Sequence, residues 1–450
     1  MSPTFQALSH REFRIYWSGM LVSNVGTWMQ RIAQDWLVLV TLGGGALATG
    51  ITTGLQFLPM LLIAPFGGVL ADNLAKRRLL MGTNGFLGLV GLALGVLVLA
   101  GVAQVWHVYV LAFLLGAGTA LDNPARQAFV SEIVGRDDLP NAVALNSASF
   151  NAARLVGPAV SGFLIMLVGP GWVFIINGVT FVGPIIALMA IRSMPGVDHV
   201  PEQSGPAGPI ARLAEGGRYV LGRPDIVMVL ATMFFVGTFG MKFQLTSALM
   251  ATEIYGKGSG EYGLLGSVMA IGTLAGALTA ARWMRPRRRL IVLAALTFGV
   301  LVIVSGSMPT YVSYAVSAVP VGFAAMTVMT ASNAYVQISV PQYVRGRVMS
   351  LYMMVFMGGA PLGAPAIGWV GDALGARWTL WGGGALVLLG TLAATLLMAR
   401  SSGIDISWRL RPYPRLLVDT TPPVDPDTGR DLRLVTGSVG RARRRGRPVR

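Results

Sequence analysis

The chain has 450 residues, of which 54% are hydrophobic and 12% are charged, and it contains no cysteine. This much apolar surface exceeds what a single soluble core buries, so the composition indicates a membrane protein. The lack of cysteine excludes disulfides, thiolate metal sites and cysteine nucleophiles. The formal net charge is +16. Because much of it lies in loop edges and in the tail after Met398, we attribute it to attraction to anionic lipid headgroups and expect no nucleic-acid partner.

Apolar stretches recur from Phe13 to Met398, and a membrane helix needs about 20 residues to cross the hydrocarbon. We predict an all-α membrane protein with twelve transmembrane helices, at residues 14–42, 46–71, 79–101, 105–128, 141–168, 172–192, 224–250, 261–283, 290–307, 311–335, 346–370 and 377–399. Positive charges fall almost entirely in every second gap, and Lys257 and Arg377 are the only basic residues of the other gaps. Cytoplasmic loops collect Lys and Arg, so the pattern predicts a multi-pass protein with both termini in the cytoplasm.

A proline-rich segment, residues 193–223, divides the helices into two bundles of six, residues 1–192 and 224–399. Within this linker, residues 210–221 mix apolar and charged side chains, which predicts a short helix on the cytoplasmic surface. Residues 400–450 are rich in proline and then in arginine, with no apolar run. We predict that they form a disordered cytoplasmic tail near anionic headgroups.

The two bundles resemble each other at an offset near 206 residues. Gly157 and Gly162 correspond in this way to Gly363 and Gly368, and the matched register continues through the following turn and helix. Many secondary transporters are built from two such parallel repeats, with the substrate site between them near the middle of the membrane. The two bundles are therefore predicted to be pseudo-symmetric and to enclose a central cavity.

Charged residues inside the predicted spans are the first candidates for function, because an intramembrane charge is costly. Arg31 and Asp35 lie four residues apart on one face of the first helix. A carboxylate beside a cation in a cavity can exchange a proton as access alternates, so we predict that Asp35 carries protons and that Arg31 and Arg154 tune it. A permanent Arg31–Asp35 ion pair is the alternative. Arg154, in the fifth helix, is predicted to face the same cavity, where it pairs with a carboxylate, meets an anionic substrate or has a structural partner.

The sharpest local motif joins the second and third helices. Gly68 allows close helix approach, and Asp72 is placed to accept hydrogen bonds from a helix N-terminus. Lys76, Arg77 and Arg78 then anchor the turn at the headgroups.

This motif resembles the signature loop of the major facilitator superfamily, in which a glycine, three residues and an aspartate precede a basic cluster. The resemblance implies a cytoplasmic gate made of Gly68, Asp72 and the basic cluster, in which Asp72 latches the two halves together. The alternative is that Asp72 and the basic cluster only mark a loop. The natural partners are Arg345 and Arg347, at the start of the eleventh helix. Asn73 and Ala75 stand where the family usually has Arg and Gly, which implies a weaker latch.

A similar segment, residues 368–372, ends in Asp372. It precedes a gap of the opposite membrane face, so we do not count it as a second copy of the motif. The true counterpart is residues 276–289, which keep the basic cluster but have Ala280 where the aspartate would be.

Three more segments, residues 121–130, 215–220 and 345–350, are similar to the enterobactin exporter branch of bacterial efflux proteins within this superfamily. The resemblance extends over residues 13–398. It implies a transporter of the bacterial cytoplasmic membrane that exports a small amphipathic molecule, such as a siderophore or drug. It also implies alternating access, proton antiport, no cofactor and a proton gradient as the energy source. We expect a monomer.

The fourth and fifth helices carry two further motifs. Asp122 and Arg126 are four residues apart near the cytoplasmic end of the fourth helix, and we favour a structural or gating pair over substrate contact. Gly157, Pro158 and Gly162 in the fifth helix are similar to the Gly-Pro motif of antiporters. Proline bends a helix and glycine permits tight packing, so this segment is a candidate pivot, with simple helix packing as the alternative.

The substrate cavity is predicted from residues that offer a polar contact or an adaptable apolar wall. They are Trp28, Gln34, Phe57, Met241, Lys242, Met353 and Met357. The five apolar candidates, Trp28, Phe57, Met241, Met353 and Met357, have lipid-facing or core positions as their alternative. For Lys242 the alternative is a side chain that extends outward to the membrane surface.

Two other functions remain open at this point. One is a proton-coupled importer or facilitator of a small nutrient, and the other is a lipid-handling protein without small-molecule efflux. An enzyme is not expected, because His10, His107 and His199 are too widely separated for a metal cluster. A phosphate-binding loop is also lacking, so direct use of ATP is not expected.

Overall fold

The computed structural model describes residues 3–73, 75–191, 209–280, 287–401, 404–409 and 415–420. Side chains are described in these ranges except at residues 3–4, 64–73, 136, 209–213, 404–409 and 415–420. Nearly all of the described residues are helical, and they divide by contacts into two compact units, Met1–Thr391 and Leu392–Arg450. The first unit holds both predicted bundles up to residue 391.

The first half follows a short 3-10 turn, Pro3–Ser9. Its helices are α1 (Arg11–Trp36), α2 (Gly45–Asn73), α3 (Lys76–Leu99), α4 (Val105–Val168), α5 (Pro170–Thr180) and α6 (Val182–Ala190). α4 contains two of the predicted spans, and they join at Gly135, where a φ of 79° interrupts the helix. Within this half, α4 packs against α1, α2 and α3, and α3 packs against α5.

The second half begins with α7, the short linker helix. Its helices are α7 (Pro209–Leu221), α8 (Pro224–Phe235), α9 (Phe243–Leu249), α10 (Ser259–Ala280), α11 (Arg288–Gly306), α12 (Tyr311–Ser339), α13 (Gln342–Gly358), α14 (Ala360–Leu374) and α15 (Ala376–Ser401). Here α12 packs against α10 and α11, and α7 packs against α13. The eleventh predicted span is divided into α13 and α14, and the seventh is interrupted between α8 and α9.

The predicted all-α fold is confirmed. Eleven of the described helical stretches are long and apolar enough to cross a membrane. α1, the first predicted span, is not among the eleven. Its polar and charged residues, Gln30, Arg31 and Asp35 among them, lower its hydropathy, but it packs among the other helices. Large apolar side chains stand exposed along several helices, as lipid-facing surfaces require; examples are Leu89, Leu167, Leu278 and Leu389.

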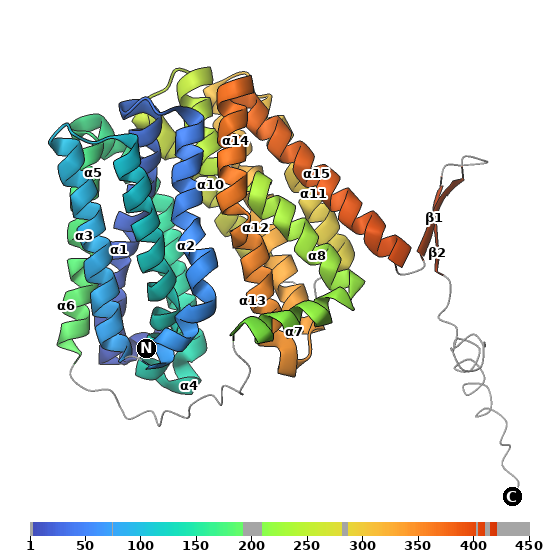
Figure 1. Cartoon of the computed structure of the whole chain (residues 1–450), viewed down its shortest axis with the longest axis horizontal. Coiled ribbons are helices and arrows are strands. Elements are labelled where there is room, and N and C mark those ends of the chain that lie inside the picture. The colour runs from blue at the N-terminus through green and yellow to red at the C-terminus, as the bar shows by residue number, and fades with distance from the viewer. Residues whose placement is uncertain are drawn as a thin grey trace, which may run out of the picture. The chain divides into compact units, whose positions relative to one another are not determined.

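The two halves meet mainly along α2 with α14 and along α4 with α10. Figure 1 shows α2 at the edge of the first half and α14 at the facing edge of the second. Glycine permits this close approach, because a Cβ at Gly54 would lie 3.1 Å from the carbonyl oxygen of Pro361. On the other contact, a Cβ at Gly263 would lie 2.9 Å from the Cα of Gly162. Small residues therefore determine where the halves touch.

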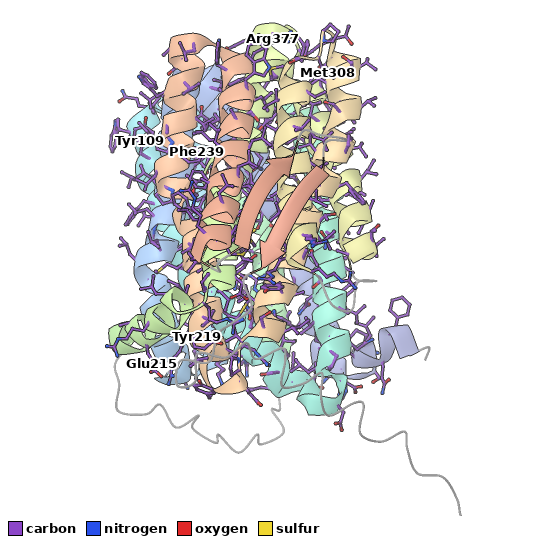
Figure 2. The ribbon with its side chains drawn as sticks, turned by 90° about the vertical axis from the view of Figure 1, so that its right-hand side faces the viewer. Tyr109, Glu215, Tyr219, Phe239, Met308 and Arg377 are labelled. Atoms are coloured by element: carbon purple, nitrogen blue, oxygen red, sulfur yellow. The ribbon has the colours of Figure 1, made fainter. Side chains whose placement is uncertain are left out.

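The helices have two distinguishable ends. Figure 2 shows Arg377 and Met308 at one end and Glu215 and Tyr219 at the other. Below, these are called the Arg377 end and the α7 end. Arg377 donates to the carbonyl oxygens of Gly306 at 2.8 Å and Met308 at 3.2 Å, which joins two loops at its end.

Residues after α15 include one feature that the sequence did not predict. β1 (Ile404–Arg409) and β2 (Arg415–Thr420) form an antiparallel hairpin in which Ile404 lies opposite Thr420. The other tail residues and residues 192–208 of the linker lie outside the described residues. Disorder of the rest of the tail, and the division into domains, therefore stay predictions.

Candidate functional site

The centre of the candidate site is Asp35, in the last turn of α1. Its side chain is buried, and its Oδ2 accepts a hydrogen bond from the Tyr262 hydroxyl at 3.0 Å. Tyr262 belongs to α10, so this bond connects the first half of the molecule to the second. The indole of Trp36 stacks on the Tyr262 ring, with centroids 6.2 Å apart and planes inclined by 21°. The tyrosine is therefore held in place by packing as well as by the carboxylate.

Arg31 and Arg154 share an aromatic partner. The guanidinium carbon of Arg31 lies 4.9 Å from the centroid of Trp28, and that of Arg154 lies 5.5 Å from the same ring. A cation above an aromatic face is attracted by its quadrupole. The ion pairs among the described residues do not include Arg31 with Asp35, nor Arg154 with any carboxylate. Two cations therefore flank one tryptophan without a carboxylate in contact.

Glycine brings α4 to this position. A Cβ at Gly157 would lie 2.6 Å from the Cβ of Trp28, so only glycine permits the present distance between α4 and α1. Arg154 comes three residues earlier on α4, about one helical turn, and so reaches the same tryptophan. Phe150, a further turn along, meets Trp28 edge to face at 5.5 Å.

The same segment of α4 contacts the second half. The Ser259 hydroxyl of α10 donates to the carbonyl oxygen of Gly162 at 3.2 Å. A Cβ at Gly266 would lie 2.8 Å from the Cβ of Pro158. The predicted pivot thus lies between α1 and α10, while its movement stays a prediction.

The seventh predicted helix is broken where it carries Lys242. α8 passes into a π-helical turn, Val236–Gly240, and α9 starts only at Phe243. The Lys242 side chain is 8% exposed, and its ammonium makes no hydrogen bond or ion pair with the described residues. α9 also packs against α1, which carries Asp35. A buried cation without a protein partner needs water or a ligand, and interrupted helices are common at transport sites.

The other predicted cavity residues are dispersed. Gln34 is buried at 4% exposure, whereas Met353 is 45% exposed. Phe57 and Met357 are partly buried. Met241 lines a cavity of about 10 Å³ whose other walls all belong to the second half. That volume holds at most a water molecule. Trp28 is not among its lining residues, so Met241 and Trp28 do not line one cavity in this structure.

The predicted cytoplasmic gate is only partly described. The side chains of Gly68 and Asp72 lie outside the described residues. Lys76 forms an ion pair with Glu132 of α4, and Arg77 donates to the carbonyl oxygen of Met189 at 3.1 Å. These contacts stay within the first half.

The proposed partners on α13 also have other contacts. Arg347 forms an ion pair with Glu215 of α7, and Arg345 donates to the carbonyl oxygen of Val340 at 3.3 Å. These side-chain contacts of Lys76, Arg77, Arg345 and Arg347 therefore do not join the two halves, although α2 contacts α7 and α13. The Asp72 latch stays a prediction.

Asp122 and Arg126 form the expected pair inside the first half. Arg126 donates to Asp122 Oδ2 through Nε at 3.0 Å and through Nη2. Asp122 is 1% exposed and also accepts from Thr83 at 2.7 Å and Asn84 at 3.0 Å. These donors use most of the acceptor capacity of one carboxylate, an arrangement that favours a structural role.

Two important residues were not singled out from the sequence. Tyr262 lies in a predicted membrane span, where an aromatic residue is common. The only indication of a function in the sequence is its hydroxyl group, which needs a hydrogen-bond partner inside the membrane. Asp372 is not counted as part of a second signature motif. In the structure, however, its Oδ1 accepts a hydrogen bond from the Ala46 amide at 2.7 Å and its Oδ2 accepts one from the Leu47 amide at 2.9 Å. An α14 carboxylate thus caps the N-terminus of α2 and joins the halves at the Arg377 end.

The described residues also bear on metal chemistry. They contain no group of three or more His, Asp or Glu side chains placed to hold a metal ion. The polar groups that converge near Asp35 are a carboxylate, a phenol and guanidinium groups, which can exchange protons and bind anions.

The comparison with known families decides the class of protein. The family described as transmembrane secretion effector matches residues 2–430. The chain belongs to this family. It is a branch of the major facilitator superfamily, so this protein is a membrane transporter.

Several curated proteins resemble this transporter. The multidrug efflux pump Tap of Mycolicibacterium fortuitum is 29% identical over 385 residues, which cover 84% of this chain and 93% of that protein. The staphyloferrin A transporter of Staphylococcus aureus is 23% identical, with 80% and 90% covered. The enterobactin exporter EntS of Shigella boydii is 25% identical, with 82% and 85% covered.

Solved structures confirm the fold of this transporter. A bacterial homologue of the human lysosomal transporter Spinster superposes with a TM-score of 0.69 at 14% identity, covering 88% of this chain and 98% of that one. A D-xylose-proton symporter superposes with a TM-score of 0.65 at 13% identity, covering 84% and 97%.

Proposed function

We propose that this transporter exports a small amphipathic molecule, of siderophore or drug type, by alternating access and in exchange for protons. Its curated relatives are named as a multidrug efflux pump, a staphyloferrin A transporter and an enterobactin exporter. Direction of transport and class of substrate are taken from that likeness. The mechanism rests on residues of this chain.

The observation that carries the proposal is the hydrogen bond from Tyr262 to Asp35. It crosses from α10 to α1, so it exists only while the two halves are closed at this level. An ionised carboxylate is a stronger acceptor than a protonated one. Protonation of Asp35 therefore weakens a contact between the halves, and separation of the halves changes the environment in which Asp35 holds its proton.

The alternation of charge assigns the two ends of the molecule to the two sides of the membrane. Most Lys and Arg residues lie in the set of loops that includes the α7 linker. Because cytoplasmic loops collect these residues, we assign the α7 end to the cytoplasm. The Arg377 end then faces outward. The halves touch there through Asp372 and the α2 N-terminus, and in this proposal that contact belongs to a conformation closed at the Arg377 end.

The substrate site is assigned to the cations near Trp28 and in the broken seventh helix. Arg31, Arg154 and Lys242 make no ion pair with the described carboxylates. Trp28 provides a flat apolar surface beside two of these cations. Such a site suits a molecule with an aromatic or apolar body and an anionic or oxygen-rich group.

The proposal is tested with Asp35→Asn, which keeps the size of the side chain and removes its titration. Efflux of siderophores, dyes and antibiotics is measured in cells and in everted vesicles with an imposed proton gradient. We expect the variant to lose gradient-driven transport while it still binds substrate. Asp137→Asn is the matched control, because Asp137 is exposed on α4.

Equal gradient-driven efflux by Asp35→Asn and the wild type would remove Asp35 as the proton carrier. Collapse of the proton gradient separates the exporter from the importer. Loaded cells should retain substrate if the protein exports it, whereas an importer would stop accumulating it.

A further inference from the structure

A crevice lies between α3 and α4, apart from the site around Asp35. Its volume is about 570 Å³, within the usual range of pockets that accept small molecules. Its walls are mainly apolar and include Phe86 and Leu121, and Arg78 lies among its lining residues. The transport mechanism proposed above uses none of this volume.

Glycine creates the space. A Cβ added at Gly82 would meet no atom within 4 Å, so this position faces the open crevice. At Gly118, on the opposite wall, a Cβ would lie 2.8 Å from the Leu87 side chain and 3.0 Å from the Phe86 ring, so glycine there allows α3 and α4 to pack closely beside the crevice. The open space therefore lies at Gly82, and a larger residue at this position would occupy part of the crevice without a backbone clash.

The guanidinium of Arg78, at one end of the crevice, is exposed and could contact a ligand. Among the basic residues of this turn, Lys76 is paired with Glu132 and Arg77 is bonded to the Met189 carbonyl. Arg78 is exposed and makes no hydrogen bond or ion pair with the described residues. Ala75, which also lines the crevice, is the N-cap of α3 and offers no side-chain cap to the first turn. An exposed guanidinium and the N-terminus of a helix both attract an anion.

The order of polar and apolar groups along the crevice matches that of a phospholipid in the membrane. α3 begins at Lys76, at the end of a membrane span, where headgroups are found. Phe86 is ten residues further along the helix, which is about 15 Å deeper at 1.5 Å per residue. The positive groups thus stand at headgroup level and the apolar walls extend into the hydrocarbon.

We propose that this crevice binds one anionic phospholipid. Its phosphate contacts Arg78 and the N-terminus of α3, and an acyl chain lies against Phe86, Gly82 and Leu121. Thr83 also lines the crevice, and its hydroxyl donates a hydrogen bond to Asp122 Oδ1. The occupant therefore packs directly over the buried Asp122–Arg126 pair. The proposal does not depend on the transported substrate.

The test uses the full-length protein in nanodiscs of phosphatidylcholine that contain a minor fraction of phosphatidylglycerol. Lipids retained after transfer to neutral detergent are counted by native mass spectrometry. We expect the wild type to retain one phosphatidylglycerol. Arg78→Gln should reduce retention about fivefold, the effect of one basic residue at an anionic surface. Gly82→Leu should reduce retention, because its side chain occupies the part of the crevice beside Phe86.

Arg289→Gln is the matched control. Arg289 is an exposed arginine in the first turn of α11, at the corresponding turn of the second half, and it should leave retention unchanged. Thermal unfolding in pure phosphatidylcholine checks that each variant is folded. Inorganic phosphate at millimolar concentration should not displace the lipid, because it lacks the acyl chain.

Three results would overturn the proposal. These are equal retention by Arg78→Gln and the wild type, equal retention of phosphatidylcholine and phosphatidylglycerol, and displacement by inorganic phosphate alone. If Gly82→Leu does not fold, Arg78→Gln still decides the question. Transport is not measured in this experiment, so its outcome is separate from that of the efflux assay.

Discussion

The contact between Asp35 and Tyr262 leads to a quantitative prediction. Tyr262→Phe removes the hydroxyl that donates to Asp35 at 3.0 Å but keeps the ring that stacks on Trp36. A hydrogen bond to a charged group contributes about 1.5–3 kcal/mol. Because this bond joins the two halves, its loss destabilises the conformation that is closed at the Arg377 end. At 1.4 kcal/mol for each factor of ten, the equilibrium shifts toward the open form by roughly 10- to 100-fold.

The natural lack of cysteine makes this shift measurable. Ser259→Cys introduces one thiol of nearly the same size at a buried position between α10 and α4. Its reaction with a membrane-impermeant maleimide reports opening at the Arg377 end. We expect faster labelling when Tyr262→Phe is added, together with weaker proton coupling of efflux.

Tyr311→Phe is the matched control. Its hydroxyl donates to the Glu261 carbonyl at 2.8 Å, entirely within the second half. Its removal should leave labelling unchanged. If Tyr262→Phe and Tyr311→Phe label at the wild-type rate, the Asp35–Tyr262 bond does not hold the halves together and the reasoning fails.

Three other predictions concern the same mechanism. Asp372→Ala removes the carboxylate that caps α2, which costs about 0.5–2 kcal/mol, and should speed labelling of Ser259→Cys from outside. Gly157→Leu places atoms against Trp28, where even a Cβ would be 2.6 Å from the Trp28 Cβ; we expect a loss of about 1–3 kcal/mol in unfolding free energy and a lower melting temperature. Lys242→Met should raise the KM for anionic substrates about tenfold, as loss of a charged hydrogen bond predicts, and leave uncharged dyes unaffected in the same efflux assay.

Two of these predictions have a control variant, and each has a result that would contradict it. Gly85→Ala should be neutral, because its Cβ would meet no atom closer than 4.0 Å, and equal melting temperatures for it and Gly157→Leu would contradict the packing argument. Lys242→Arg keeps the charge and should restore anionic transport in part. An unchanged KM in Lys242→Met would exclude Lys242 from the binding site. Unaltered labelling in Asp372→Ala would mean that the cap does not hold the Arg377 end closed.

Local patterns predicted some contacts well. Asp122 and Arg126 are four residues apart on one helix, so helical geometry alone brings them together, and they are paired. The same spacing at Arg31 and Asp35 was misleading as a guide to contact. There, Trp28 holds the guanidinium and Tyr262 holds the carboxylate. A sequence shows which residues are able to meet, but competing partners from other helices determine which ones do.

The sequence by itself determined the number and order of the membrane helices, the linker helix and the family, because hydropathy, charge alternation and short motifs are local properties. Only the tertiary structure decided how the halves are joined. Asp35 and Tyr262 are 227 residues apart, and Asp372 is 326 residues from the amide that it caps at Ala46. Such pairs depend on how closely glycines allow α2, α4, α10 and α14 to approach. That distance is a property of packed surfaces and is not present in any single segment of the chain.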